Sequence, residues 1–158
     1  MLFKVGLGQD SHRLDKGENR PLMLGGIEIP SMLSLQGNSD ADTVLHAICN
    51  AISSVSGKVI MGPYTDKLCL DQGITDSAVY VKEALKTLQD YKISHIAVSI
   101  ECLVPKIFPH IKKMKSKIAA ILEINNENVG ITATSGEGLT LFGQGKGIQA
   151  FVIATVMK

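Results

Sequence analysis

Apolar and polar residues alternate in short blocks along the first third of the chain. Residues 1–7 (MLFKVGL) alternate as a half-buried strand does, and residues 21–30 (PLMLGGIEIP) hold two apolar runs around a Gly-Gly pair, which predicts a hairpin or a bulged strand. A loop is expected over residues 31–39. Apolar residues then recur at a helical period and predict a helix over about 40–55, opened by Ser39 in a Ser-x-x-Asp sequence with capping-box spacing.

The rest of the chain continues this mixture of elements. The patterns predict two helices, over about 109–124 and 76–91, and three strands, over about 94–104, 128–135 and 147–157. Residues 56–77 hold glycines and a proline without a period and are expected to be irregular, either mobile or functional. Hairpin-like and crossover connections, without a repeat or a linker, indicate one α+β (mixed α/β) domain over residues 1–158. We expect one mixed β-sheet with helices packed on one face.

The last predicted strand, residues 147–157 (GIQAFVIATVM), is apolar at almost every position. A strand of this kind is expected to be covered on both faces. In a chain of this size one of the covering layers can come from another subunit, so the pattern makes a homo-oligomer plausible.

Composition and charge narrow the class of protein. The chain is 45% apolar and 20% charged, as in ordinary globular proteins, and its net charge of +1 gives no electrostatic reason to expect nucleic acid or an anionic membrane as a partner. The three cysteines, Cys49, Cys69 and Cys102, lack CxxC spacing, which favours a reducing compartment. Because there is no signal-like N-terminal run and no 18-residue apolar span, we expect a cytoplasmic protein.

The first candidate metal ligands lie in residues 8–13 (GQDSHR), directly after the first predicted strand. Residues i and i+2 of a strand point to the same face, so Asp10 and His12 are expected to converge. For these residues alone, a pair of unrelated surface neighbours is the simpler interpretation. His46, in the predicted helix after Ser39, would complete three nitrogen and oxygen ligands and leave a fourth position open, which is typical of a catalytic zinc site.

Two later loops carry further candidate groups. Residues 132–138 (TATSGEG) offer hydroxyls, glycines and the Glu137 carboxylate, a combination that can hold phosphate oxygens and a cation such as Mg²⁺; a simple polar turn is the alternative. Residues 104–110 (VPKIFPH) carry Lys106 between two prolines, and the alternative there is an ordinary helix entry with Pro109 in an early position.

A series of short motifs runs along essentially the whole chain. They are G-x-D-x-H (8–12), LGG-x-x-IP (24–30), SD-x-D-x-x-LH (39–46), PK-x-x-PH-I (105–111), AT-x-x-E-x-L (133–139) and G-x-G-x-GI (143–148). In this order they resemble the 2-C-methyl-D-erythritol 2,4-cyclodiphosphate synthase family of the non-mevalonate isoprenoid pathway. The first and third motifs together are specific, and the others add order and spacing.

The resemblance implies a phosphorus-oxygen lyase that acts as a homotrimer, with active sites between neighbouring subunits. One Zn²⁺ per chain would be held by Asp10, His12 and His46, with the β-phosphate of the substrate at the open position. Glu137 would hold a second divalent cation, Mg²⁺ or Mn²⁺, between the two phosphates. The 2-phosphate of 4-diphosphocytidyl-2-C-methyl-D-erythritol 2-phosphate would attack the β-phosphate of its own CDP group, which releases CMP and closes the cyclic diphosphate.

The same resemblance assigns the groups that would surround the substrate. Catalytic roles fall to Asn38 and Ser135. The expected substrate-binding residues are Ser39, Asp66, Cys102, Leu103, Val104, Pro105, Lys106, Ile107, Phe108, Ala133, Thr134, Leu141 and Gln144.

The sequence departs from the family pattern mainly on the sugar-phosphate side. Asn38 stands where the family commonly has His, and Asn50 where it has Asp one turn after the zinc-binding His. Residues 57–66 (GKVIMGPYTD) replace two family signatures, and only Asp66 aligns; Gln144 lies in a rewritten glycine-rich motif. A divergent active cyclase is the leading hypothesis. A paralogue that binds zinc and a cytidine nucleotide without efficient cyclisation is the alternative, and a zinc hydrolase of another small phosphate ester fits less well.

Overall fold

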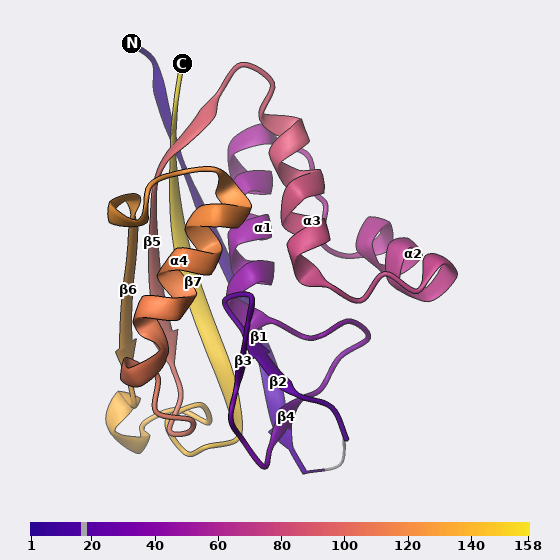
Figure 1. Cartoon of the computed structure of the whole chain (residues 1–158), viewed down its shortest axis with the longest axis vertical. Helices are drawn as coiled ribbons and strands as arrows, with labels where there is room; N and C mark the ends of the chain where they lie inside the picture. Colours follow the sequence, from indigo (N-terminus) through magenta and orange to yellow (C-terminus); the bar gives the residue numbers. More distant parts are fainter. Residues whose placement is uncertain (17–18) are drawn as a thin grey trace.

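The computed structural model describes residues 1–16 and 19–158, which form a mixed β-sheet with helices on one face (Figure 1). The sheet has the strand order β4-β1-β7-β5-β6. Its strands are β1 (Phe3–Asp15), β4 (Ser34–Leu35), β5 (Lys92–Glu101), β6 (Val129–Thr134) and β7 (Gly147–Met157). β7 pairs antiparallel with both β1 and β5, whereas β6 pairs parallel with β5. The predicted fold class, α+β with one mixed sheet, is confirmed.

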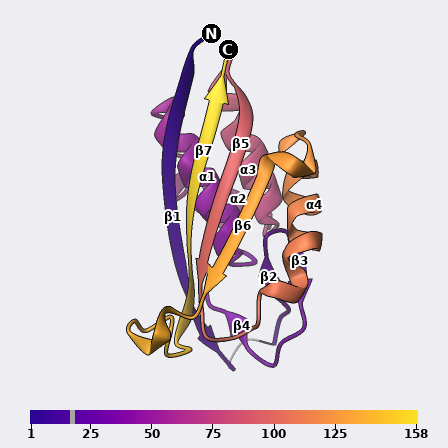
Figure 2. The ribbon, with the colours of Figure 1, turned by 90° about the vertical axis from the view of Figure 1, so that its left-hand side faces the viewer.

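In the described part of the chain, the other elements are a separate hairpin, four α-helices and short 3₁₀ turns. The hairpin consists of β2 (Leu22–Leu24) and β3 (Ile27–Ile29), and the helices are α1 (Thr43–Ser56), α2 (Pro63–Gln72), α3 (Ser77–Leu85) and α4 (Ile111–Leu122). In the part of the chain that the structure describes, none of these helices has the length and apolar character needed to cross a membrane. Figure 2 shows the strands in front and the helices behind them, with α4 beside β6.

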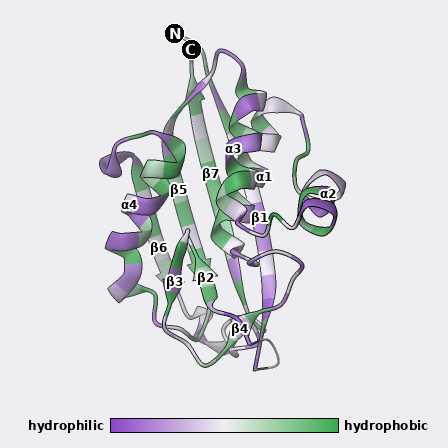
Figure 3. Ribbon diagram, turned by 45° about the vertical axis from the view of Figure 1, so that its right-hand side comes forward, coloured by the Kyte–Doolittle hydropathy of each residue, from purple (hydrophilic) through white to green (hydrophobic). Residues whose placement is uncertain are grey.

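Close packing of α1 on the sheet places the central turns of the helix over Gly6 and Gly8 of β1. A Cβ atom at Gly6 or Gly8 would lie 2.1 Å from the carbonyl oxygen of Ala51 or Ala47, so only glycine permits the observed approach. The core then forms between α1 and the sheet, and Figure 3 shows hydrophobic residues along β5 and β7 while much of α4 is hydrophilic. This packing positions the site, because it brings one face of α1 against the strand that carries residues 10 and 12.

The face of the sheet opposite the helices is open in the single chain. Along β7, alternate residues are buried under the helices, but Phe151 and Ile153 are 44% and 46% exposed. Val5 and Leu7 of the adjacent β1 are also exposed. One chain therefore covers only one face of the last strand, and the expected second layer is not supplied by the described residues of the chain itself.

Several predicted boundaries are wrong. The first strand continues to Asp15, and α1 begins at Thr43 rather than next to Ser39. The N-cap of α1 is Asp42, whose side chain accepts a hydrogen bond from the Leu45 amide. The Asp42 carboxylate also accepts hydrogen bonds from the amides of Gly25 and Gly26. This contact with the β2–β3 hairpin favours Asp42 over Ser39 as the N-cap residue.

The segment expected to be irregular, residues 56–77, contains α2. Pro63 starts this helix and Gly73 ends it in the left-handed conformation, but only Thr65 and Cys69 are buried. A helix with so small a buried face has no apolar period to predict it. Further along, the helix predicted over 76–91 ends at Leu85 and continues as a 3₁₀ turn, the strand expected over 94–104 is β5, and the expected loop 31–39 contains β4.

Candidate metal centre and active site

Asp10, His12 and His46 meet in space. Asp10 and His12 lie on the helix-facing side of β1, and His46 lies on the face of α1 that packs against it. Nε2 of His12 is 2.9 Å from Oδ2 of Asp10 and 3.1 Å from Nδ1 of His46, and the Asp10–His46 pair of atoms is 3.3 Å apart. In a tetrahedral zinc site with bonds of about 2.0–2.1 Å, neighbouring ligand atoms lie about 3.3 Å apart. The triangle is therefore close to one face of a zinc tetrahedron.

The outer ring nitrogens of both histidines are engaged by other groups. Nδ1 of His12 donates to the carbonyl oxygen of Gln36 (2.6 Å), and Nε2 of His46 faces the hydroxyl of Ser77 (2.8 Å). The Ser77 hydroxyl in turn donates to Oδ1 of Asp40, and its amide donates to Oδ2 (3.1 Å). These bonds assign the tautomers in which Nε2 of His12 and Nδ1 of His46 carry free lone pairs toward each other, as metal ligands require.

Electrostatics in the triangle favour a bound cation. Burial raises the pKa of Asp10, but its contacts with His12 and His46 lower it more, so the pKa lies below its usual value. Burial lowers the pKa of His12, but the Asp10 carboxylate raises it more, so the net shift is upward. Oδ2 of Asp10 is buried, and no described residue donates a well-aligned hydrogen bond to it, although both ring nitrogens are close. A cation at the centre would contact all three atoms, so the donor set fits zinc.

A cavity of about 290 Å³ lies beside the triangle. It contains the predicted residues Asn38, Ser39 and Asp66. The other residues that line it are Asp10, His12, Gly37, His46, Met61, Gly62, Thr65, Cys69 and Tyr80. Of these, Thr65 and Cys69 were missed because they belong to α2, a helix with no sequence signature. Asn50, one turn after His46, lies outside the cavity lining and donates to the carbonyl oxygen of Gln9 (3.0 Å).

A second cavity, of about 180 Å³, lies where β5 and β6 end. Its lining matches the predicted cytidine loop and consists of Cys102, Leu103, Pro105, Lys106, Ile107, Phe108, Ala133, Thr134 and Ser135. Val104, joined to Pro105 by a cis peptide bond, is exposed next to this lining. Leu141 lies instead in a neighbouring cavity that Lys146 and Arg13 also line, and Gln144 donates to the carbonyl oxygen of Gly138 (3.0 Å).

Glu137 is displayed on an unusual turn. Gly136, Glu137 and Gly138 follow one another with φ of 64°, 53° and 72°, so the turn is left-handed throughout and Glu137 is exposed. Glu101 at the end of β5 supports it, because a Cβ at Gly136 would lie 2.0 Å from Oε1 of Glu101, which also accepts the Thr140 hydroxyl. Among the described residues, the metal-ligand cluster of the single chain is Asp10, His12 and His46, and it does not include Glu137.

An α+β domain with an Asp-His-His triad in the wall of a cavity is typical of a metal-binding enzyme, and comparisons with known proteins identify the family. The YgbB family model matches residues 3–157, so the chain belongs to the YgbB family. A relative from Chlamydia muridarum, named 2-C-methyl-D-erythritol 2,4-cyclodiphosphate synthase, is 52% identical over 159 residues, which covers 99% of this chain and 89% of that protein. The expected family resemblance is confirmed.

Solved structures agree with this assignment. The bifunctional IspDF from Campylobacter jejuni superposes with a TM-score of 0.86 at 26% identity, over 98% of this chain and 42% of that longer one. A 2C-methyl-D-erythritol-2,4-cyclodiphosphate synthase described as a CDP-bound form gives a TM-score of 0.81 at 27% identity, over 98% of this chain and 100% of that one. The same fold therefore occurs in an enzyme that binds a cytidine nucleotide.

Proposed function

We propose that the protein converts 4-diphosphocytidyl-2-C-methyl-D-erythritol 2-phosphate into 2-C-methyl-D-erythritol 2,4-cyclodiphosphate and CMP. The observation that carries this proposal is the triangle of Asp10, His12 and His46, found in a chain 52% identical to a relative that bears the name of this activity. The reaction needs no external nucleophile, because an oxygen of the 2-phosphate attacks the β-phosphorus. The bond from that phosphorus to the bridging oxygen breaks, and CMP leaves with the bridging oxygen.

The cavity residues act on the phosphates and on the sugar. Bound Zn²⁺ supplies positive charge and Lewis-acid chemistry to a phosphate oxygen. The Asn38 amide is a donor for phosphate oxygens at the cavity wall, where it would stabilise charge that develops in the transition state. Asp66 offers a carboxylate to the hydroxyls of the methylerythritol group, and Ser39 lines the wall beside His46. This arrangement acts by positioning and by charge neutralisation, which suits phosphoryl transfer.

The cytidine loop and Glu137 complete the proposed site. Residues 102–108 and 133–135 surround a cavity into which a pyrimidine edge can place its donors and acceptors against the backbone. Ser135 lines this cavity and directly precedes the turn that carries Glu137. The Glu137 carboxylate would hold the second divalent cation, Mg²⁺ or Mn²⁺, which would supply positive charge to the phosphates.

A homotrimer would join the two halves of the site. Exposed apolar side chains from neighbouring strands, among them Val5, Leu7, Phe151 and Ile153, form a continuous apolar surface on the open face of the sheet. Packing three such faces together would bury this surface and set the Glu137 turn of one chain against the metal triad of the next. The proposed compartment is the cytoplasm, in keeping with three free buried cysteines.

The test of the function is product analysis with purified protein, Zn²⁺ and Mg²⁺. We expect CMP and the cyclic diphosphate in equal amounts, and neither product from the variant His12→Ala. CMP with an open-chain phosphate would instead identify a hydrolase. Binding of Zn²⁺ and CDP without turnover would identify a nucleotide-binding paralogue, the alternative that Asn38 in place of the usual His favours.

A further inference from the structure

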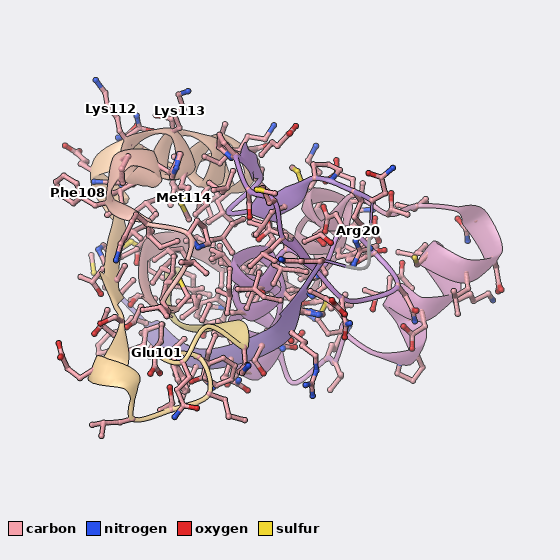
Figure 4. All side chains as sticks on the ribbon, turned by 90° about the horizontal axis from the view of Figure 1, so that it is seen from below. Arg20, Glu101, Phe108, Lys112, Lys113 and Met114 are labelled. Carbon is pink, nitrogen blue, oxygen red and sulfur yellow. The ribbon has the colours of Figure 1, made fainter. Side chains whose placement is uncertain are left out.

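Arg20 reaches across to a segment that borders the metal centre. This residue precedes β2, and its guanidinium group donates to three backbone carbonyl oxygens. Nη2 donates to Leu35, and Nη1 donates to Gly37 (3.0 Å) and to Ser39. Seen from below in Figure 4, Arg20 lies on the side of the molecule toward α2, away from Phe108 and Glu101.

The carbonyl groups of Gln36 and Asn38, which lie between these three residues in the chain, point toward the metal centre and its cavity instead. The carbonyl oxygen of Gln36 accepts Nδ1 of His12 (2.6 Å), and that of Asn38 accepts the thiol of Cys69 (2.8 Å). The carbonyl groups of residues 35–39 thus alternate between the Arg20 guanidinium and the site, although β4 ends at Leu35 and residues 37–39 form bends. Arg20 therefore supplies donors to the carbonyl groups on one side of residues 35–39, while the carbonyl groups on the other side contact a candidate metal ligand and a residue of the cavity.

Residues 35–39 also touch the metal-binding side chain directly. A Cβ atom added to Gly37 would lie 3.1 Å from Cε1 of His12 and 3.2 Å from its Nδ1, so the Gly37 backbone approaches the imidazole ring closely. A small displacement of Gly37 therefore moves His12 or leaves its ring unsupported. The contact couples the position of the Arg20 guanidinium to the orientation of a candidate zinc ligand.

We propose that Arg20 is a positioning residue of the active site, a proposal that rests on the proposed function. It holds residues 35–39 in the conformation in which Gln36 orients His12 and Asn38 lines the cavity. A planar guanidinium with donors in a fixed fork can serve three carbonyls at once, whereas a lysine ammonium is a single point of charge. The role is thus specific to arginine and not to positive charge alone.

The test compares Arg20→Met and Arg20→Lys with the parent protein. We expect Arg20→Met to weaken zinc binding about 10- to 100-fold, as loss of groups that orient metal ligands does, and Arg20→Lys to give an intermediate loss. Affinity for CDP, whose cavity lies at the ends of β5 and β6, should stay within about twofold because Arg20 does not contact that region. Lys86→Met, which removes a cation from an exposed ion pair with Glu83, is the matched control and should leave zinc affinity unchanged.

Hydrogen exchange gives a readout that needs no metal. The amide of Gln36 donates to Arg13 (3.0 Å) and that of Asp40 donates to Thr75 (2.9 Å), and both should exchange at least tenfold faster in Arg20→Met. Zinc affinity and exchange within twofold of the parent would overturn the proposal, as would an equal loss of zinc and CDP affinity. If Arg20→Met does not fold, parental values in Arg20→Lys overturn it. Absence of zinc binding by the parent would instead contradict the proposed function, and the exchange comparison would still decide the role of Arg20.

Discussion

Nε2 of His12 and Nδ1 of His46 lie 3.1 Å apart, although the two residues are 34 positions apart in the chain. The approach depends on Gly6 and Gly8, which let α1 lie directly on β1, and on partners that hold each ring by its other nitrogen. Two neutral imidazoles that present lone pairs to one point repel each other unless a proton or a metal ion lies between them. This relationship leads to the first prediction.

Removing either imidazole should remove the metal. We expect His12→Ala and His46→Ala to lose zinc and activity while they keep a folded circular dichroism spectrum, because neither imidazole belongs to the hydrophobic core. Metal analysis of the purified variants measures this directly. Full zinc occupancy in both variants would show that the ligands are elsewhere.

Zinc affinity should fall as the pH is lowered, starting above pH 6.5. The Asp10 carboxylate raises the pKa of His12 above its ordinary value of about 6.5, so in the metal-free protein a proton competes for Nε2 already near neutral pH. The raised pKa also means that the metal-free protein gains stability from this ion pair at low pH and loses it as the pH rises through the folded-state pKa. Competition titrations with a chelator between pH 6 and 8 test the predicted fall in zinc affinity. A zinc affinity that does not change across this range would contradict the prediction.

Ser77 should support zinc binding without being a ligand. Its hydroxyl accepts Nε2 of His46 and donates to Asp40, so Ser77→Ala removes the group that fixes the tautomer of His46. We expect zinc affinity to fall about tenfold, at the lower end of the usual effect, because the hydroxyl of Ser39 lies 3.2 Å from the same nitrogen and can replace it in part. Ser116→Ala on the exposed face of α4 is the control, and equal affinities of the two variants would disprove the role.

Much of this arrangement could be predicted from the sequence. The features that could not be predicted depend on contacts between residues that are distant in the chain. The i, i+2 spacing of Asp10 and His12 fixes a common strand face, and the helical period places His46 on a buried helix face. Arg20 carries no such signal, because it contacts carbonyl groups 15 to 19 residues away through a side chain whose direction no period reveals. Asp42, and not the predicted Ser39, is the N-cap of α1, because the β2–β3 hairpin donates two further amides to the Asp42 carboxylate.

Asn38 should make the enzyme slower than a relative with a histidine at this place. A neutral amide donor stabilises transition-state charge less than a cationic imidazole, a difference on the order of 1–3 kcal/mol, or roughly ten- to hundredfold in rate. Asn38→His should raise kcat, most clearly below about pH 6.5, where an unperturbed imidazole is protonated. Asn38→Ala should lower kcat further. If Asn38→Ala turns over as fast as the parent from pH 6 to 8, Asn38 has no catalytic role.

A charge on the open face of the sheet should dissociate the proposed trimer. Leu7 is 60% exposed on β1 opposite Ile153 of β7, so Leu7→Asp would place a carboxylate in the apolar surface between subunits. Light scattering should give a trimer mass for the parent and a monomer mass for this variant, with activity lost. Leu70→Asp on α2, where Leu70 is 67% exposed, is the matched control and should remain trimeric. A monomeric parent at micromolar concentration would contradict the assembly.

The central claim is that the protein closes a ring by using an oxygen of its own substrate. Turnover in water enriched in ¹⁸O, followed by mass spectrometry of both products, tests this most directly. An intramolecular attack predicts that CMP and the cyclic diphosphate both form without any ¹⁸O from the solvent. One solvent ¹⁸O in CMP or in an open-chain phosphate product, with no cyclic diphosphate, would show that water is the nucleophile and would contradict the account.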